Sequence, residues 1–151
     1  MTTSIVSKNK VFILLAQGFE EVPTVYCLGR MRKASLPVAL VGLSSGLVTG
    51  MFGLTIRPDH SLDQVQSDEA GRLVLIPGGR QCTTLLLADP RVHQLLECTL
   101  TMNGFVATTV GATAVISQTL TLLANSQKNF LPQGDMSLGK FASFLIDAAT
   151  K

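Results

Sequence analysis

The sequence predicts an α/β protein built on a mostly parallel sheet, and three observations support that fold class. Several short runs are apolar throughout, which is typical of parallel strands buried on both faces. The segments between them carry apolar residues at helical spacing. Strands and helices alternate, which favours right-handed crossovers with helices on both faces of the sheet. The four main strands are expected at 11–16, 36–42, 73–76 and 105–108.

The first strand leads into a helix. The strand stops at Gln17 and Gly18, as expected for a central parallel strand. The next two residues are acidic, which suits a helix N-terminus, and a proline follows in what would be the first turn. We expect this helix to end near Ala34. The residues predicted to face the sheet are Val22, Val25, Tyr26 and Gly29.

The middle of the chain contains two strands and an excursion. The strand at 36–42 has Pro37 near its start, where a strand tolerates proline. Glycine breaks divide 45–58 into short β-prone pieces, which predicts a β-ribbon at a sheet edge. We expect a helical turn over 61–64 and a polar surface loop over 66–72. The third strand is then closed by the run Pro77-Gly78-Gly79-Arg80.

The second half contains a strong helix start. Asp89 and Pro90 suit the N-cap and first position of a helix that stops at Asn103-Gly104, after a short helix over 83–87. Beyond the fourth strand we expect a helix over 112–123 and a short last strand at 130–131. A final helix over 138–149 is expected to be capped by Asp135 or Ser137.

Length and composition fit one domain over residues 1–151. Hydrophobic residues make up 46% of the chain and charged residues 15%, which is enough apolar material for a core and suits an apolar subunit surface. We therefore expect a homo-oligomer, most simply a homodimer. The formal net charge is +2 with lysines and arginines scattered, so no nucleic-acid partner is expected.

The cysteines indicate a reducing compartment. Cys27, Cys82 and Cys98 are odd in number and widely spaced, which fits neither a disulfide framework nor a metal site. The first apolar run is too short for a secretion signal or a membrane span. We expect a cytoplasmic location, no membrane association, no metal and no cofactor.

A strand-to-helix turn is the candidate position for chemistry. Ala107 and Gly111 flank Thr109 as small residues flank the central residue of a nucleophile elbow. Threonine is stiff at χ1, and its hydroxyl is inert without an adjacent base. Ligands of parallel sheets bind outside the carboxyl ends of the strands, so 18–21, 77–82 and 109–111 are expected to share one rim.

Four blocks of the sequence resemble the DJ-1/PfpI (ThiJ) family of the class I glutamine amidotransferase-like superfamily. The likeness covers roughly 10–124, and its most specific parts are Gly-Phe-Glu-Glu-Val at 18–22 and Pro-Gly-Gly-Arg at 77–80. The other blocks are 46–65 and the turn around 109–111. The resemblance implies a flavodoxin-like three-layer sandwich with a mostly parallel sheet. Typical members carry about two dozen more residues than the 125–133 segment here, so the domain is expected to be shortened near its C-terminus.

The resemblance also implies a changed reactive site. The family's reactive Cys falls on Thr109, the following residue on Val110, and the partner Glu on Pro23. A threonine hydroxyl cannot be ionised as a thiol can. These changes favour a binding, regulatory or stress-related module, a pseudoenzyme of its family, over an enzyme. The alternative is a thiol-dependent enzyme or redox sensor that uses Cys82 or Thr109.

Further candidates lie on the same rim. Cys82 follows a glycine pair near a helix start, where a lowered thiol pKa is expected. A third class of function, nucleotide binding, has least support because the first loop lacks a phosphate-binding glycine motif. The rim is the expected place for a small-molecule ligand. Its expected residues are Glu20, Glu21, Pro23, Gly78, Gly79 and Val110.

Overall fold

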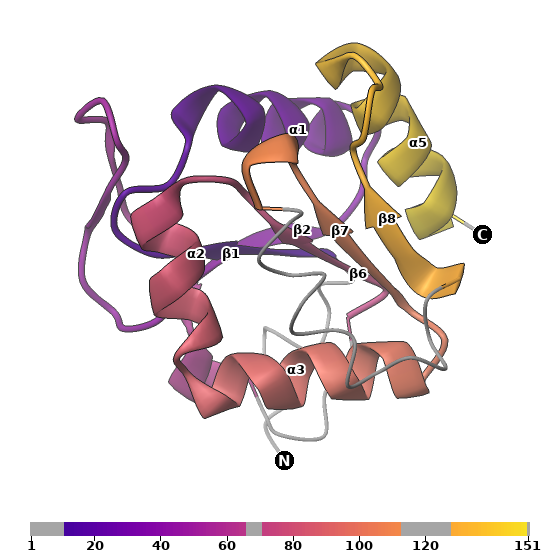
Figure 1. The fold of residues 1–151 in the computed structure, drawn as a ribbon. Coiled ribbons are helices and arrows are strands. Elements are labelled where there is room, and N and C mark those ends of the chain that lie inside the picture. Colours follow the sequence, from indigo (N-terminus) through magenta and orange to yellow (C-terminus); the bar gives the residue numbers. More distant parts are fainter. Residues whose placement is uncertain (1–10, 66–70, 113–127, 151) are drawn as a thin grey trace.

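The computed structural model describes residues 11–65, 71–112 and 128–150, which form three layers. A six-stranded sheet in the order β5-β2-β1-β6-β7-β8 lies in the middle, and all of its strand pairs are parallel. Helices α1 (Glu21–Lys33) and α5 (Leu138–Thr150) lie side by side on one face, while α2 (Arg80–Leu87) and α3 (Pro90–Thr101) cover the other (Figure 1). The predicted α/β sandwich with its flavodoxin-like sheet is confirmed.

The four apolar runs are the four central strands. They are β1 (Val11–Leu15), β2 (Val38–Gly42), β6 (Leu73–Ile76) and β7 (Phe105–Thr108). Strand β1 lies between β2 and β6, and Ile13 is in register with Leu40 on one side and Leu75 on the other. Because helices cover both faces, every residue of β1 is buried, as continuous apolar runs predict.

The start of α3 follows the predicted capping pattern. The Asp89 carboxylate accepts a hydrogen bond from the Arg91 N–H at 2.9 Å, and Pro90 occupies the first helical position. The helix ends before Asn103, whose φ of 64° is the left-handed conformation favoured after a helix. Helix α2 begins three residues earlier than predicted, directly after Gly79.

The buried face of α1 is not the one predicted. Val22 and Val25 are 71% and 45% exposed and Tyr26 is 38% exposed, while Gly29 also lies at the surface. The residues that pack inward are Thr24, Cys27 and Met31, which share an equally good helical spacing. Thr24 can be buried because its hydroxyl donates to the Glu20 carbonyl at 2.7 Å, leaving no unsatisfied donor.

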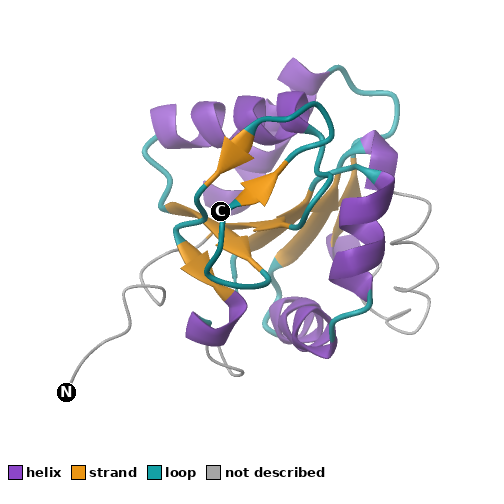
Figure 2. Cartoon of the chain, turned by 90° about the vertical axis from the view of Figure 1, so that its left-hand side faces the viewer, coloured by secondary structure: helices purple, strands orange, loops and turns teal. Residues whose placement is uncertain are grey.

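The predicted ribbon is a separate antiparallel hairpin. Strands β3 (Val48–Thr49) and β4 (Thr55–Ile56) pair only with each other. The chain then adds β5 (His60–Ser61) to the edge of the main sheet, a strand too short and too polar to be predicted. A short 3-10 helix, η2 (Leu62–Gln64), follows where a helical turn was expected. Figure 2 shows this side of the molecule facing the viewer.

The C-terminal part also follows the prediction closely. Strand β8 (Phe130–Pro132) pairs in parallel with β7 and is one residue longer than expected. Ser137, and not Asp135, caps α5, because its hydroxyl accepts from the Lys140 N–H at 3.2 Å. Residues 110–112 are already helical, while the rest of the helix expected over 112–123 and most of the loop expected over 66–72 lie outside the described residues. None of the helices that are described is long and apolar enough to cross a membrane.

Candidate functional site

Three loops meet at the carboxyl ends of the central strands. The Glu20 N–H, after β1, donates to the Gly78 carbonyl, after β6, at 3.0 Å. The Thr109 N–H, after β7, donates to the Ile76 carbonyl at 3.3 Å. Segments that are far apart in the sequence therefore share one rim, as expected for the ends of neighbouring parallel strands.

Two glycines of the rim are required by its geometry. Gly79 has a φ of 110°, and a Cβ there would collide with the Gly18 carbonyl of the first loop. Its own carbonyl accepts from both the N–H and the hydroxyl of Thr83, each at 2.8 Å. The glycine pair therefore turns the chain into α2 and lets the first and third loops approach each other.

The Glu20 carboxylate lies against two of these loops. Its Oε1 occupies the place that a Cβ on Gly78 or on Gly111 would need, so both glycines leave room for the acid. Glu20 stands at the N-cap of α1, but its side chain forms no capping hydrogen bond. The rim thus carries an acidic group directly beside the strand-to-helix turn, contributed by Glu20.

Pro23 belongs to helix α1 and not to the loop that precedes it. It lies inside the first turn of α1, which begins at Glu21. The family resemblance placed the partner acid position at Pro23, while Glu20 was expected among the ligand-binding residues of the rim. The structure brings Glu20, the residue directly before α1, to the turn.

Glu21 binds the hairpin. Its Oε2 accepts from the N–H groups of Phe52 at 2.7 Å and Leu54 at 3.2 Å. Burial alone would raise the pKa of the Glu21 carboxyl, but the two backbone donors outweigh it and the pKa is lowered. Glu21 was expected at the ligand rim, and its hydrogen bonds give it a structural role at the hairpin.

Thr109 sits at the strand-to-helix turn, as predicted. It follows β7 and precedes the helical residues 110–112, and its exposed fraction is only 1%. The non-glycine residues with positive φ, among those described, are Ser35 and Asn103. Thr109 therefore lacks a left-handed backbone, and its buried side chain is not presented to solvent as an elbow nucleophile would be.

Cys82 does not have the lowered pKa expected of it. The residue is fully buried in the first turn of α2. Burial and, to a smaller extent, the Glu20 charge raise the pKa of its thiol to about 12, although a hydrogen bond with the Ala16 backbone partly opposes them. Cys27 is also fully buried, and burial raises its pKa to about 11. Neither thiol resembles an activated nucleophile.

The turn is bonded to the segment between β8 and α5 through Gln133, a residue the sequence did not single out. The Val110 N–H donates to Gln133 Oε1 at 3.3 Å, and Gln133 Nε2 donates to the Met136 carbonyl at 3.0 Å. The Gln133 N–H also donates to the Thr108 carbonyl at 2.9 Å. Side-chain amides give no periodic signal, so only the tertiary structure could reveal this contact.

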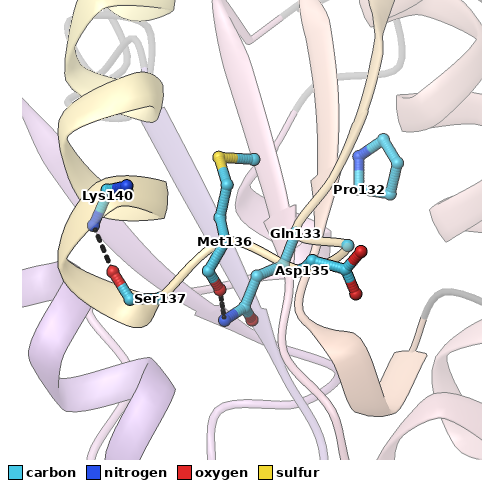
Figure 3. A pocket seen from close by; sticks show the side chains of 7 residues that line it. Pro132, Gln133, Asp135, Met136, Ser137 and Lys140 are labelled. Carbon is cyan, nitrogen blue, oxygen red and sulfur yellow. Dashed lines mark hydrogen bonds between the residues drawn. The ribbon is translucent and has the colours of Figure 1, made fainter.

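A surface hollow of about 660 Å³ adjoins this contact (Figure 3). Residues 132–137 and Lys140 line it, with Asp135 and Lys140 as its charged residues. Gln133 belongs both to this lining and to the contact with Val110. No group of three histidine, cysteine or acidic side chains is close enough to hold a metal ion in 11–65, 71–112 and 128–150.

A family model describes most of the chain. Residues 9–127 match the DJ-1/PfpI family. The chain belongs to this family. Glu20, the glycine pair after β6 and the turn at Thr109 all lie within the matched range.

Named relatives come from archaea and animals. A deglycase of Thermococcus kodakarensis is 41% identical over 71 residues, which are 47% of this chain and 42% of that protein. Deglycase PfpI of Pyrococcus furiosus is 35% identical over 84 residues, 56% of this chain and 50% of the relative. The Parkinson disease protein 7 homolog of Danio rerio is 30% identical over 111 residues, 72% of this chain and 59% of the relative. The chain thus spans about half the length of the relatives it matches.

Solved structures support the fold. An oxidized DJ-1 of Toxoplasma gondii superposes with a TM-score of 0.80 at 19% identity, covering 94% of each chain. A DJ-1 superfamily protein of Salmonella typhimurium gives a TM-score of 0.77 at 21% identity, covering 91% of this chain and 88% of the other. At these identities the likeness concerns the fold, and the activity depends on the residues of the rim.

Proposed function

We propose that this chain is a non-catalytic member of its family, a self-associating binding or regulatory module of the cytoplasm that takes a small molecule at the rim. The observation that carries the proposal is Thr109. At the position that the family resemblance assigns to a reactive Cys, this chain has a buried threonine in a turn without left-handed backbone. No thiol can be ionised there, and the hydroxyl is shielded from a substrate.

The surroundings of Thr109 support the same conclusion. A threonine nucleophile requires a base within hydrogen-bond reach. His60 lies in β5 at the far edge of the sheet, and the His93 ring is bonded to the Leu87 carbonyl at 2.6 Å. Neither histidine belongs to the three loops of the rim. Glu20 remains, but one carboxylate beside a hydroxyl does not make the nucleophile, base and orienting group of a hydrolase.

The relatives named deglycases do not extend that activity to this chain. They match about half of their own length, and the proposal concerns the residues at which this chain departs from the family pattern. The rim can still bind a ligand without reacting with it. Glu20 offers one acidic group and Gly78 and Gly79 offer backbone groups at a single edge of the sheet, while the Val110 N–H is bonded to Gln133.

Intact-mass measurement after mild peroxide or iodoacetamide tests the proposal against a thiol-dependent alternative. We expect Cys82 to remain unmodified in the folded protein, because its thiol is buried and has a raised pKa. The control is the same protein in denaturant, in which Cys82 should react fully. A fast, single adduct on Cys82 under native conditions would instead support a redox sensor or thiol enzyme.

A further inference from the structure

The surface hollow beside Gln133 has the size and the place of a small-molecule site. Its volume of about 660 Å³ lies within the range of about 300–1,000 Å³ that ligand pockets occupy. Strand β8 ends at its border, where Pro132 is in register with Thr108. The hollow therefore lies at the carboxyl edge of the parallel sheet, where such folds bind ligands. Its lining includes no residue of the three rim loops, and we call it the β8–α5 hollow.

The wall of the β8–α5 hollow is a turn with a fixed shape. The Met136 N–H donates to the Gln133 carbonyl at 3.1 Å and closes the turn. Gly134 lies inside it with a φ of 57°, which a glycine adopts without strain. The Gln133 side chain adds a second bond across the turn, from its Nε2 to the Met136 carbonyl. The lining is thus preorganised, which lowers the entropy lost when a ligand binds.

Lys140 carries its charge at an unfavourable place in its own helix. It is the third residue of α5, whose first turn contains no acidic residue, and the helix dipole opposes a positive charge there. Its backbone N–H is already satisfied by the Ser137 hydroxyl, so the cap needs nothing from the lysine side chain. A residue that breaks a local rule without a structural gain indicates a functional site. An ammonium group beside a helix start favours a bound carboxylate.

Asp135 brings the opposite charge to the same hollow. It precedes the cap of α5 but does not form it, since Ser137 takes that role. Within the described residues, neither Asp135 nor Lys140 forms an ion pair or a side-chain hydrogen bond. In the view of Figure 3, Met136 lies between the two charged residues. The hollow therefore offers a ligand one acidic and one basic group on either side of an apolar side chain.

We propose that the β8–α5 hollow binds a small zwitterion of the amino-acid type. Its carboxylate lies at Lys140, its ammonium group at Asp135, and its carbon skeleton against Met136. A ligand with only one charge would be repelled by one of the two residues, so the pair selects for both charges. The hollow is separate from the ligand rim of the proposed function. Gln133 nevertheless joins it to the turn after β7, because its Oε1 accepts from the Val110 N–H.

Nuclear magnetic resonance titration of the isotope-labelled full chain with L-alanine tests this site. We expect saturable shifts of the backbone amides of 133–140, with a Kd in the millimolar range, and a smaller shift of the Val110 amide. Propionate lacks the ammonium group and ethylamine lacks the carboxylate. Each of them should bind at least about tenfold more weakly than L-alanine.

Variants of the two charged residues locate the ligand. Lys140→Gln and Asp135→Asn alter exposed side chains, so both should fold, and each should weaken L-alanine binding by about tenfold. The matched controls are Lys33→Gln and Asp147→Asn, which remove exposed charges of the same kinds on α1 and α5 outside the hollow. They should leave the Kd unchanged. The dispersion of the amide spectrum verifies the fold of each variant.

Three results would overturn the proposal. L-alanine that causes no saturable shift at tens of millimolar would show that the β8–α5 hollow is not a site for it. Shifts confined to 18–21, 77–82 and 109–111, and unchanged in Lys140→Gln, would place the ligand at the rim, which agrees with the proposed function but not with a second site. Propionate that binds as tightly as L-alanine would show that Asp135 takes no ammonium group.

Discussion

The Glu20 carboxylate lies directly against Gly111, two residues beyond Thr109, in the space that a Cβ on Gly111 would fill. This contact joins the first loop to the turn after β7. It explains why a glycine suits the turn there, and it places the Glu20 carboxylate beside the turn, whereas the family resemblance placed the partner acid at Pro23. Several consequences can be measured.

Gly111→Ala should destabilise the fold by about 1–3 kcal/mol, because the added methyl group must displace the Glu20 carboxylate. Glu20→Ala in the same chain should recover most of that loss, since the next contacts of the new Cβ are at 3.3 Å. Urea unfolding of the two single variants and the double variant gives the coupling free energy. Gly29→Ala is the control, because a Cβ on Gly29 meets open space. If Gly111→Ala lowers the free energy of unfolding equally in the wild type and in Glu20→Ala, the contact between Glu20 and Gly111 is contradicted.

Thr109→Cys should not recreate a reactive thiol. Burial and the neighbouring Glu20 charge both disfavour a thiolate, so its pKa should lie above the free value of about 8.5. Glu20→Gln in this background should lower the pKa of the new thiol and speed its reaction. The rate of iodoacetamide labelling as a function of pH measures each pKa. If the labelling rate of Thr109→Cys alone already reaches its plateau below pH 8, its thiol pKa is lowered and this arrangement of charges is refuted.

Cys82 should make the stability depend on pH in alkaline solution. Its folded pKa of about 12 lies above the reference value of 9.0, so the unfolded chain loses this proton first. The contribution of Cys82 is therefore complete below about pH 9 and is lost as the pH rises toward 12. Between pH 8 and pH 10.5, the free energy of unfolding should fall more for the wild type than for Cys82→Ala. Parallel slopes for the two proteins would show that the thiol ionises freely.

Gln133→Ala should loosen the turn that follows β7. It removes the bonds to Val110 and Met136, which together should contribute about 1 kcal/mol, and it should speed hydrogen exchange of the Val110 amide. Gln94→Ala is a matched control, since Gln94 is exposed on α3. If Val110 exchanges at the same rate in Gln133→Ala and the control, the side-chain contact does not protect the turn.

Much of this structure could be predicted because burial on both faces leaves a direct trace in the sequence. The central strands are continuous apolar runs, and the cap at Asp89 and the turn at Gly79 require particular residue types. The face of α1 was predicted wrongly because two helical spacings compete, and the apolar one lies on the outside. β5 has only two residues and no pattern to reveal it.

The site was only partly predictable. The three loops could be assigned to one rim because parallel strands end at the same edge. That Glu20 is the acidic residue against the turn depended on where α1 begins and on how the loops pack, which the sequence does not show. The pKa of Cys82 depended on its burial, which a helix-start position alone does not determine. Gln133 acts through a bond to Val110 that is set only by the packing of β8 beside β7.

The most direct test of the central claim is a turnover assay of the wild-type protein with methylglyoxal and with a glycated thiol, alongside Thr109→Val. We expect the wild type to remain at the background rate and Thr109→Val to be indistinguishable from it, because the residue at the position that the resemblance assigns to the reactive Cys has a buried hydroxyl. A family member with its reactive cysteine serves as the positive control. Wild-type turnover above background that Thr109→Val abolishes would show that this chain is an enzyme.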